Sequence, residues 1–138
     1  MTRVYFARAV DGRDWSHVTR EAELFAQKAL TYGLTVVDPV LSWGQPTAWT
    51  TASDLVNHDL GLLGESDVLL CDMTIACRNY IGCCFELAYA HAWRIPTIVV
   101  VGATGYDQRP WLIHHATRIV EDMDRGLEAV AGYNDSRS

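Results

Sequence analysis

Glu86 is the residue whose type and position in this chain most directly suggest chemistry. It falls in the first turn of a predicted helix, Gly82 to Trp93, and its neighbours Phe85 and Leu87 are apolar. A carboxylate in that place is either a solvated partner of the helix dipole, worth about 0.3–1 kcal/mol, or a nucleophile at the edge of a site. Because first-turn acids are common, the residues alone favour the first interpretation.

The segments around this helix predict how Glu86 is positioned. Ser66 to Met73 is typical of a buried strand, Thr74 to Ile81 of a loop, and Ile95 to Gly102 of a second strand. Strand, loop, helix and strand in this order form a parallel βαβ crossover. Ligands of open parallel sheets collect at the carboxyl ends of the strands, so Glu86 is expected near a ligand-binding edge.

The same alternation continues along the whole chain. Further strands are predicted at Arg3 to Ala7, Leu34 to Val37 and Thr117 to Glu121, and helices at Trp15 to Tyr32, Ala52 to Gly64, Trp111 to Ala116 and Asp122 to Ala131. The stretch 38–51 is polar and is predicted to lack regular structure. The pattern predicts a single α/β domain over residues 1–131, a flavodoxin-like or Rossmann-like three-layer sandwich with a five-stranded, mostly parallel sheet, followed by a flexible tail at 132–138.

Composition limits the classes of partner. The chain has 138 residues, 49% of them hydrophobic, which is enough for one domain with its own core. A net charge of −6 argues against nucleic acid polymers and anionic membranes as partners. No window approaches the roughly 18 consecutive apolar residues of a membrane span, and we expect a cytoplasmic protein.

The four cysteines favour reduced thiols. Cys71, Cys77, Cys83 and Cys84 are crowded into one short region and suit small buried side chains better than a disulfide framework. Zinc is the alternative, but the sequence has no Cys-x-x-Cys pair. We therefore expect no metal and no other cofactor.

Three segments stand in order along the chain: Tyr5-Phe6-Ala7-Arg8-Ala9, Asn57-His58-Asp59-Leu60 and Gly82-x-x-x-Glu86-Leu87-x-Tyr89-Ala90. Together they resemble the nucleoside 2-deoxyribosyltransferase family, which includes the 2'-deoxynucleoside 5'-phosphate N-hydrolases. The resemblance extends from about Val4 to Arg118. It implies an enzyme that cleaves the N-glycosidic bond of a 2'-deoxynucleoside or its 5'-monophosphate and passes the deoxyribosyl group to another base or to water.

The resemblance also implies roles for three residues. Glu86 would be the nucleophile beneath the anomeric carbon, where positive charge develops as the bond breaks. Asp59 would orient the deoxyribose or hold Glu86, and the hydroxyl of Tyr5 would reach the carboxylate or the ligand. The alternatives are an exposed helix acid for Asp59 and a buried strand tyrosine without a catalytic role for Tyr5.

Substrate-binding candidates follow from the loop after the first strand and from the motif. Arg8, Gly12 and Arg13 would present donors to a phosphate or a base edge, although loop arginines are usually solvated and one glycine is far short of a P-loop. Asn57 either hydrogen-bonds the ligand or faces solvent, and Gly82 belongs to the motif of Glu86.

Tyr80 stands six residues before Glu86. At that position the transferases tend to carry an acid and the monophosphate hydrolases a serine. A tyrosine matches neither subclass, so the choice between free nucleoside and monophosphate stays open.

Aromatic residues complete the candidate site. Trp43 and Trp49 would stack on a base, worth about 1–3 kcal/mol, or would pack their loop onto the core. His91 is expected to be structural, whereas Trp111 and His114 fall where the family forms subunit contacts, which implies a homo-oligomer, a dimer or higher. A small-molecule nucleoside or nucleotide is the expected partner, and a non-catalytic nucleotide-binding sensor of the same fold is the alternative function.

Overall fold

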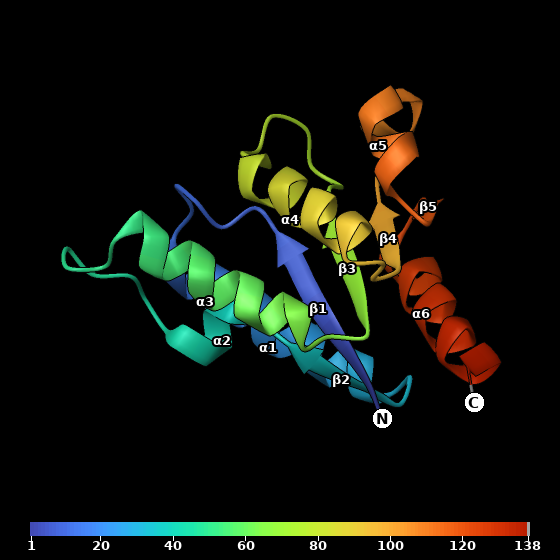
Figure 1. The fold of residues 1–138 in the computed structure, drawn as a ribbon, viewed down its shortest axis with the longest axis horizontal. Coiled ribbons are helices and arrows are strands. Elements are labelled where there is room, and N and C mark those ends of the chain that lie inside the picture. The colour runs from blue at the N-terminus through green and yellow to red at the C-terminus, as the bar shows by residue number, and fades with distance from the viewer. Residues whose placement is uncertain (138) are drawn as a thin grey trace.

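The computed structural model describes residues 1–137, and the side chains of residues 1–132. Helices and strands alternate along the chain (Figure 1). The strands are β1 (Thr2–Arg8), β2 (Leu34–Val37), β3 (Val68–Asp72), β4 (Thr97–Val100) and β5 (Arg118–Val120). The helices are α1 (Trp15–Leu30), α2 (Pro39–Trp43), α3 (Ala52–Gly64), α4 (Ile81–Ala92), α5 (Pro110–His115) and α6 (Met123–Arg137), and a 3-10 turn spans Tyr106–Gln108.

The five strands form one sheet in the order β2-β1-β3-β4-β5, and every neighbouring pair is parallel. The predicted flavodoxin-like α/β architecture is confirmed, with a sheet that is parallel throughout. Because all strands run the same way, their carboxyl ends meet at one edge of the sheet. The central pair β1 and β3 therefore brings the end of β1 next to the loop that leads into α4.

Side chains of successive strand residues point to opposite faces of the sheet and build two cores. Phe6 belongs to the core beneath α1 and α6, where its ring stacks on Phe25 with centroids 3.8 Å apart. Tyr5 belongs to the opposite core, which contains Leu63 of α3 and Leu87 of α4. The fold is thus a three-layer sandwich, and Tyr5 lies on the same side of the sheet as α4.

Two helices depart from the sequence prediction by more than two residues. Residues 39–43 form α2 within the stretch that was expected to be irregular, because Pro39 occupies its first turn and the carboxylate of Asp38 caps it by accepting from the N–H of Val40 at 2.9 Å. The last helix, α6, continues past residue 131 to Arg137.

Among the residues that the structure describes, no helix is both long enough and apolar enough to cross a membrane.

Candidate active site

A cleft of about 420 Å³ lies at the carboxyl edge of the sheet, where the end of β1 meets α2, α3 and the first turns of α4. Five of the residues predicted from the sequence line it: Arg8, Trp43, Asp59, Gly82 and Glu86. They come from four segments far apart in the chain. The fold thus brings together the centre of the expected site.

Glu86 and Tyr5 are joined directly. Tyr5 is fully buried on β1, and its hydroxyl donates a hydrogen bond to Oε2 of Glu86. Burial raises the pKa of Glu86 to about 7; Asp59 adds to the rise, while the Tyr5 hydrogen bond and the charge of Arg8 oppose it. Burial, and then the charge of Glu86, raise the pKa of Tyr5, so its hydroxyl keeps its proton and remains a donor.

Asp59 is the second carboxylate of the cleft. It lies on α3, and its Oδ1 is 3.1 Å from Nδ1 of His58. Burial raises the pKa of Asp59, and the hydrogen bond from His58 opposes that rise. Two partly buried acids from different helices therefore share one cavity, an arrangement typical of acid–base and nucleophilic sites.

Arg8 forms a buried ionic network at the wall of the cleft. Its Nη1 donates to Oδ1 of Asp38 at 2.7 Å, and its Nε lies 3.4 Å from Oε1 of Glu21. The side chains of Arg8 and Asp38 are only 2% and 1% exposed. The charge of Arg8 is therefore largely compensated by protein carboxylates, yet its Nε and Nη2 and Oδ2 of Asp38 lack hydrogen-bond partners.

Four other candidates lie outside the lining of the cleft. Gly12 occupies an exposed turn with φ of +78°, and Arg13 makes two hydrogen bonds to the carboxylate of Glu21, at 3.0 and 3.1 Å. Asn57 is exposed on α3, and Trp49 is 91% exposed. For these residues the structure offers no contact with the candidate site.

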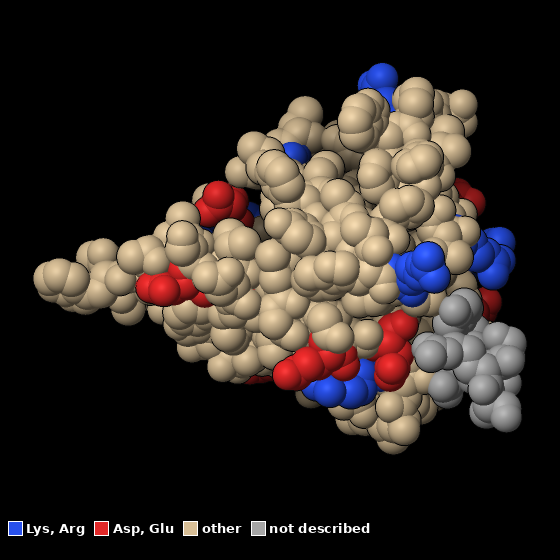
Figure 2. Space-filling view, in the orientation of Figure 1, with Lys and Arg blue, Asp and Glu red and all other residues tan. Residues whose placement is uncertain are grey.

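Tyr80 and Trp111, but not His114, line a second hollow, of about 630 Å³, between α4 and α5. The Tyr80 hydroxyl accepts from the N–H of Ile75 and donates to its carbonyl, at 3.2 and 2.9 Å. Trp111 is 81% exposed and lines this hollow. In Figure 2 the surface over α4 carries few charged side chains.

The histidines expected near α5 gather at the C-terminal end of α4. The ring centroids of His91, His114 and His115 are 4.9 to 5.1 Å apart. No group of three or more His, Cys, Asp or Glu side chains in the described part of the chain is arranged to hold a metal ion. All four cysteines are free thiols, with Cys71 and Cys83 buried.

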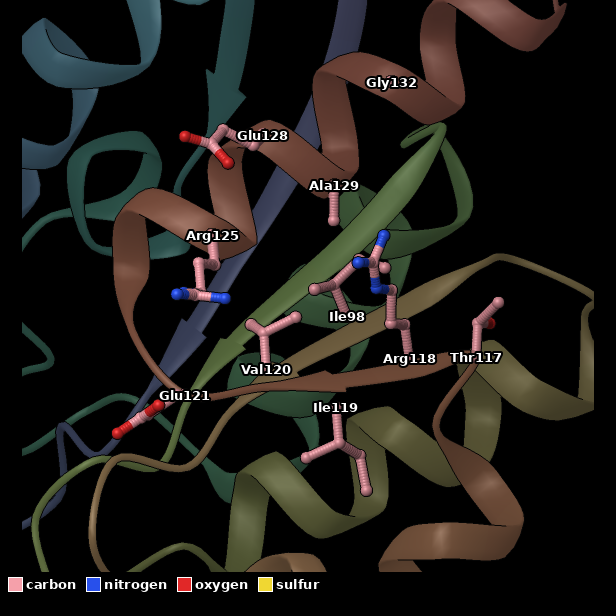
Figure 3. A pocket seen from close by; sticks show the side chains of 10 residues that line it. All are labelled: Ile98, Thr117, Arg118, Ile119, Val120, Glu121, Arg125, Glu128, Ala129 and Gly132. Carbon is pink, nitrogen blue, oxygen red and sulfur yellow. The ribbon is translucent and has the colours of Figure 1, made fainter.

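A third hollow, of about 620 Å³, lies between β5 and α6 (Figure 3). Arg118, Glu121, Arg125 and Glu128 line it, and all four are exposed. The ion pair beside it, from Nε of Arg125 to Oδ2 of Asp122, spans 3.5 Å between two solvated side chains. This hollow has charge but no buried titratable group.

Several cleft residues escaped the sequence analysis. Asn79 lines the cleft, and its Oδ1 accepts from the N–H of Ile81 at 3.0 Å where α4 begins. Its only sequence signal is an Asx residue just before the helix. Asp38 and Glu21, the partners of Arg8, carry no motif, although Asp38 directly follows β2. His58 was visible only as a member of the Asn57 to Leu60 segment.

The sheet order and the carboxylate cleft at its carboxyl edge define a flavodoxin-like α/β protein. No protein-family model matches the chain, and no curated protein matches it.

Solved structures do match it along nearly its whole length. A 2-deoxyribosyltransferase from Leishmania mexicana has a TM-score of 0.70 at 12% identity, covering 96% of this chain and 98% of its own. The 2-deoxyribosyltransferase of Bacillus psychrosaccharolyticus has a TM-score of 0.66 at 17% identity, covering 94% and 90%. The Clostridium botulinum CMP N-glycosidase BcmB has a TM-score of 0.60 at 14% identity, covering 96% and 99%. At these identities the likeness establishes the fold, and the resemblance noted in the sequence thus extends to three dimensions.

Proposed function

We propose that this chain cleaves the N-glycosidic bond of a 2'-deoxynucleoside or its 5'-monophosphate, with Glu86 as the nucleophile, and passes the deoxyribosyl group to another base or to water. The observation that carries the proposal is the Glu86 carboxyl, partly buried at the wall of a cleft and hydrogen-bonded by the fully buried Tyr5, with Asp59 in the same cavity. A carboxylate that only balanced a helix dipole would remain in water and would need neither burial nor a buried donor.

The reaction is written in two steps. An oxygen of Glu86 attacks C1' of the sugar as the bond from C1' to the base nitrogen breaks, and that electron pair leaves with the base, which takes up a proton. Water or a second base then attacks C1', releases the Glu86 carboxylate and gives up a proton, which balances the proton taken up by the departing base. Tyr5 holds the attacking carboxylate in place throughout.

The pKa of Glu86 fits this use. Because burial raises its pKa to about 7, the group ionises near neutral pH and keeps the high basicity that makes a carboxylate a better nucleophile. Asp59, from α3, supplies a hydrogen-bond acceptor for a sugar hydroxyl in the same cavity. Trp43 offers an indole face to the departing base.

The names of the structural neighbours support the same class of reaction. Two are 2-deoxyribosyltransferases and one is a CMP N-glycosidase. These names denote transfer of a deoxyribosyl group and cleavage of an N-glycosidic bond. The predicted homo-oligomer remains a proposal, supported by the exposed apolar side chains Ile81, Phe85 and Trp111 on α4 and α5.

The experiment is a base-release assay. Deoxynucleosides and their 5'-monophosphates are incubated with the protein, with and without a second free base, and products are separated by chromatography. We expect base release, and a new nucleoside if the second base is the acceptor. Glu86→Gln should reduce turnover by roughly a thousandfold or more, whereas Glu128→Gln, in the exposed β5–α6 hollow, should leave it unchanged.

Two outcomes would contradict the proposal. Retained turnover in Glu86→Gln would exclude Glu86 as the nucleophile. Tight binding of a nucleoside or nucleotide without base release by the wild-type protein would favour the nucleotide sensor instead.

A further inference from the structure

His58 connects two walls of the cleft. Its Nδ1 lies 3.1 Å from Oδ1 of Asp59, and its Nε2 lies 3.2 Å from Oγ of Ser42. The same ring packs edge-on against Trp43, with centroids 4.5 Å apart. The imidazole of His58 on α3 therefore contacts the Asp59 carboxylate. It also contacts two consecutive residues of α2, Ser42 and Trp43.

The partners of the ring fix the direction of its hydrogen bonds. An ionised carboxylate only accepts, so Nδ1 of His58 donates to Asp59. In the neutral ring Nε2 is then an acceptor, and the Ser42 hydroxyl donates to it. The result is a directed chain from Ser42 through His58 to Asp59, in which each bond polarises the next.

The α2 wall is held against α1 by Val40, which is buried with Val18 and Ala22, and is tied to α3 through His58. The helix has five residues and is followed by Gly44, with φ of +89°. In the described part of the chain, the bond between Ser42 and His58 is the one side-chain hydrogen bond that joins α2 to α3. Trp43 itself makes no side-chain hydrogen bond there, and its ring packs against His58.

Asp59 depends on the same ring. Burial and the charge of Asp38 both raise the pKa of Asp59, and His58 supplies the hydrogen bond that opposes them. Glu86 and Tyr5 face Asp59 from α4 and β1, and neither donates to it. Without His58, the carboxylate would lose its donor in a partly buried place.

We propose that His58 is a positioning residue of the cleft, which orients the Asp59 carboxylate and links it to the Ser42–Trp43 wall. The role in sugar binding rests on the proposed function. The link itself rests only on the three contacts of the ring. His58 would thus make the seating of the base at Trp43 and the state of Asp59 interdependent.

The test compares His58→Phe, Ser42→Ala and the double variant. A phenyl ring preserves the edge contact with Trp43 and removes both nitrogens. His17→Phe is the matched control, because His17 is an exposed histidine on α1 outside the cleft. Circular dichroism establishes that each variant is folded, and Ser42→Ala tests the same chain should His58→Phe fail to fold.

The first readout needs no activity: carboxyl ¹³C NMR follows the titration of Asp59. We expect the Asp59 midpoint to move to higher pH in His58→Phe and, by a smaller amount, in Ser42→Ala, with no movement in His17→Phe. An unchanged Asp59 titration in both His58→Phe and Ser42→Ala would overturn the proposal.

The second readout is kinetic. We expect kcat/KM for base release to fall about tenfold in His58→Phe, as for loss of one hydrogen bond to a charged group, with its acid limb moved to higher pH. Ser42→Ala should cost about threefold, and the double variant should be no worse than His58→Phe, since the two residues act in one chain. Additive losses would overturn the link.

Failure of the proposed function is separable from failure of this inference. A wild-type protein that releases no base contradicts the proposed function, while the Asp59 titration still decides the role of His58. A wild-type protein that releases base, with Asp59 insensitive to His58, leaves the proposed function standing and overturns the inference.

Discussion

The cleft at the carboxyl edge and the β5–α6 hollow both contain arginine and glutamate side chains, which are shielded from solvent in the cleft and exposed to it in the hollow. Arg8 in the cleft is 2% exposed and shares two carboxylates of the protein, whereas Arg125 in the hollow is 68% exposed and contacts Asp122 at 3.5 Å. Glu86 is partly buried, and burial raises its pKa to about 7, whereas Glu128 is exposed on α6. Figure 3 shows the side chains of the hollow on β4, on β5 and the residues that flank it, and on α6.

The difference lies in what surrounds a charge. Water compensates a solvated carboxylate and leaves it with the properties of the free amino acid. In the cleft, the Tyr5 hydroxyl and the neighbouring Asp59 carboxyl take the place of part of that water. The pKa of Glu86 is therefore set by protein groups. Acid–base or nucleophilic reactions are therefore expected at a carboxylate whose charge is neither fully solvated by water nor fully neutralised by protein groups.

The largest expected effect is on stability, and it contrasts two arginines. Arg8→Met should lower the free energy of unfolding by about 3–5 kcal/mol, because it leaves the buried charge of Asp38 without its partner. Arg125→Met should change it by less than about 0.5 kcal/mol. Urea denaturation followed by circular dichroism measures both. Similar losses for the two variants would show that the cleft network is not buried as described.

The next contrast concerns two glutamates and pH. Because the pKa of Glu86 rises from its usual 4.5 to about 7 on folding, the unfolded chain loses this proton first as pH rises, and the wild type loses stability between these values, by about 3 kcal/mol in total. Glu86→Gln lacks this loss, so its advantage over the wild type should grow from pH 4.5 to 7 and then level off. Denaturation across that range measures it.

Glu128→Gln is the control for that series. Its difference from the wild type should stay constant with pH. A constant difference for Glu86→Gln as well would mean that the Glu86 carboxyl is as solvated as that of Glu128.

Trp43 and Trp49 allow a comparison between a cleft residue and an exposed residue within one segment. Trp43 lines the cleft and Trp49 is 91% exposed. Trp43→Ala should raise KM roughly tenfold, as expected for the loss of one stacked base, and Trp49→Ala should leave it unchanged. Equal effects would mean that the substrate reaches both indoles.

The smallest expected effect tests the donor to Glu86. Tyr5→Phe preserves the buried ring and removes a hydrogen bond that lowers the pKa of Glu86. The acid limb of kcat/KM should therefore move to higher pH, with activity at pH 6 lower by about fivefold. A pH profile of the two proteins measures this. An unmoved limb would separate Tyr5 from the ionisation of Glu86.

Sequence reasoning predicted the fold because the signals of this chain are local and repeated. Strands such as Leu34–Val37 and helices such as Ala52–Gly64 are bounded by their own residues, and alternation of the two types predicts a parallel sheet. The helix α2 was missed because five residues are too few for a periodic pattern, although Asp38 and Pro39 together are a capping signal.

The candidate site was less accessible to prediction. Residues in the motif, such as Glu86 and Asp59, line the cleft, but the partners of Arg8 follow from tertiary packing alone. Arg13 was as good a candidate as Arg8 in sequence. Glu21 on α1 pairs with both, but only Arg8, at the end of β1, lines the cleft. Which of these two arginines lines a cavity is not encoded locally.

The hydrogen bond between Tyr5 and Glu86 also indicates when the site forms during folding. It joins positions 81 residues apart, so no part of the chain shorter than that can contain it. Contacts of such sequence separation close late, after helices such as α1 have formed locally. During synthesis on the ribosome, Tyr5 of the first strand has no Glu86 to bond until α4 has been made. A refolding chain would regain its helical circular dichroism before the hydrogen bond between Tyr5 and Glu86 forms.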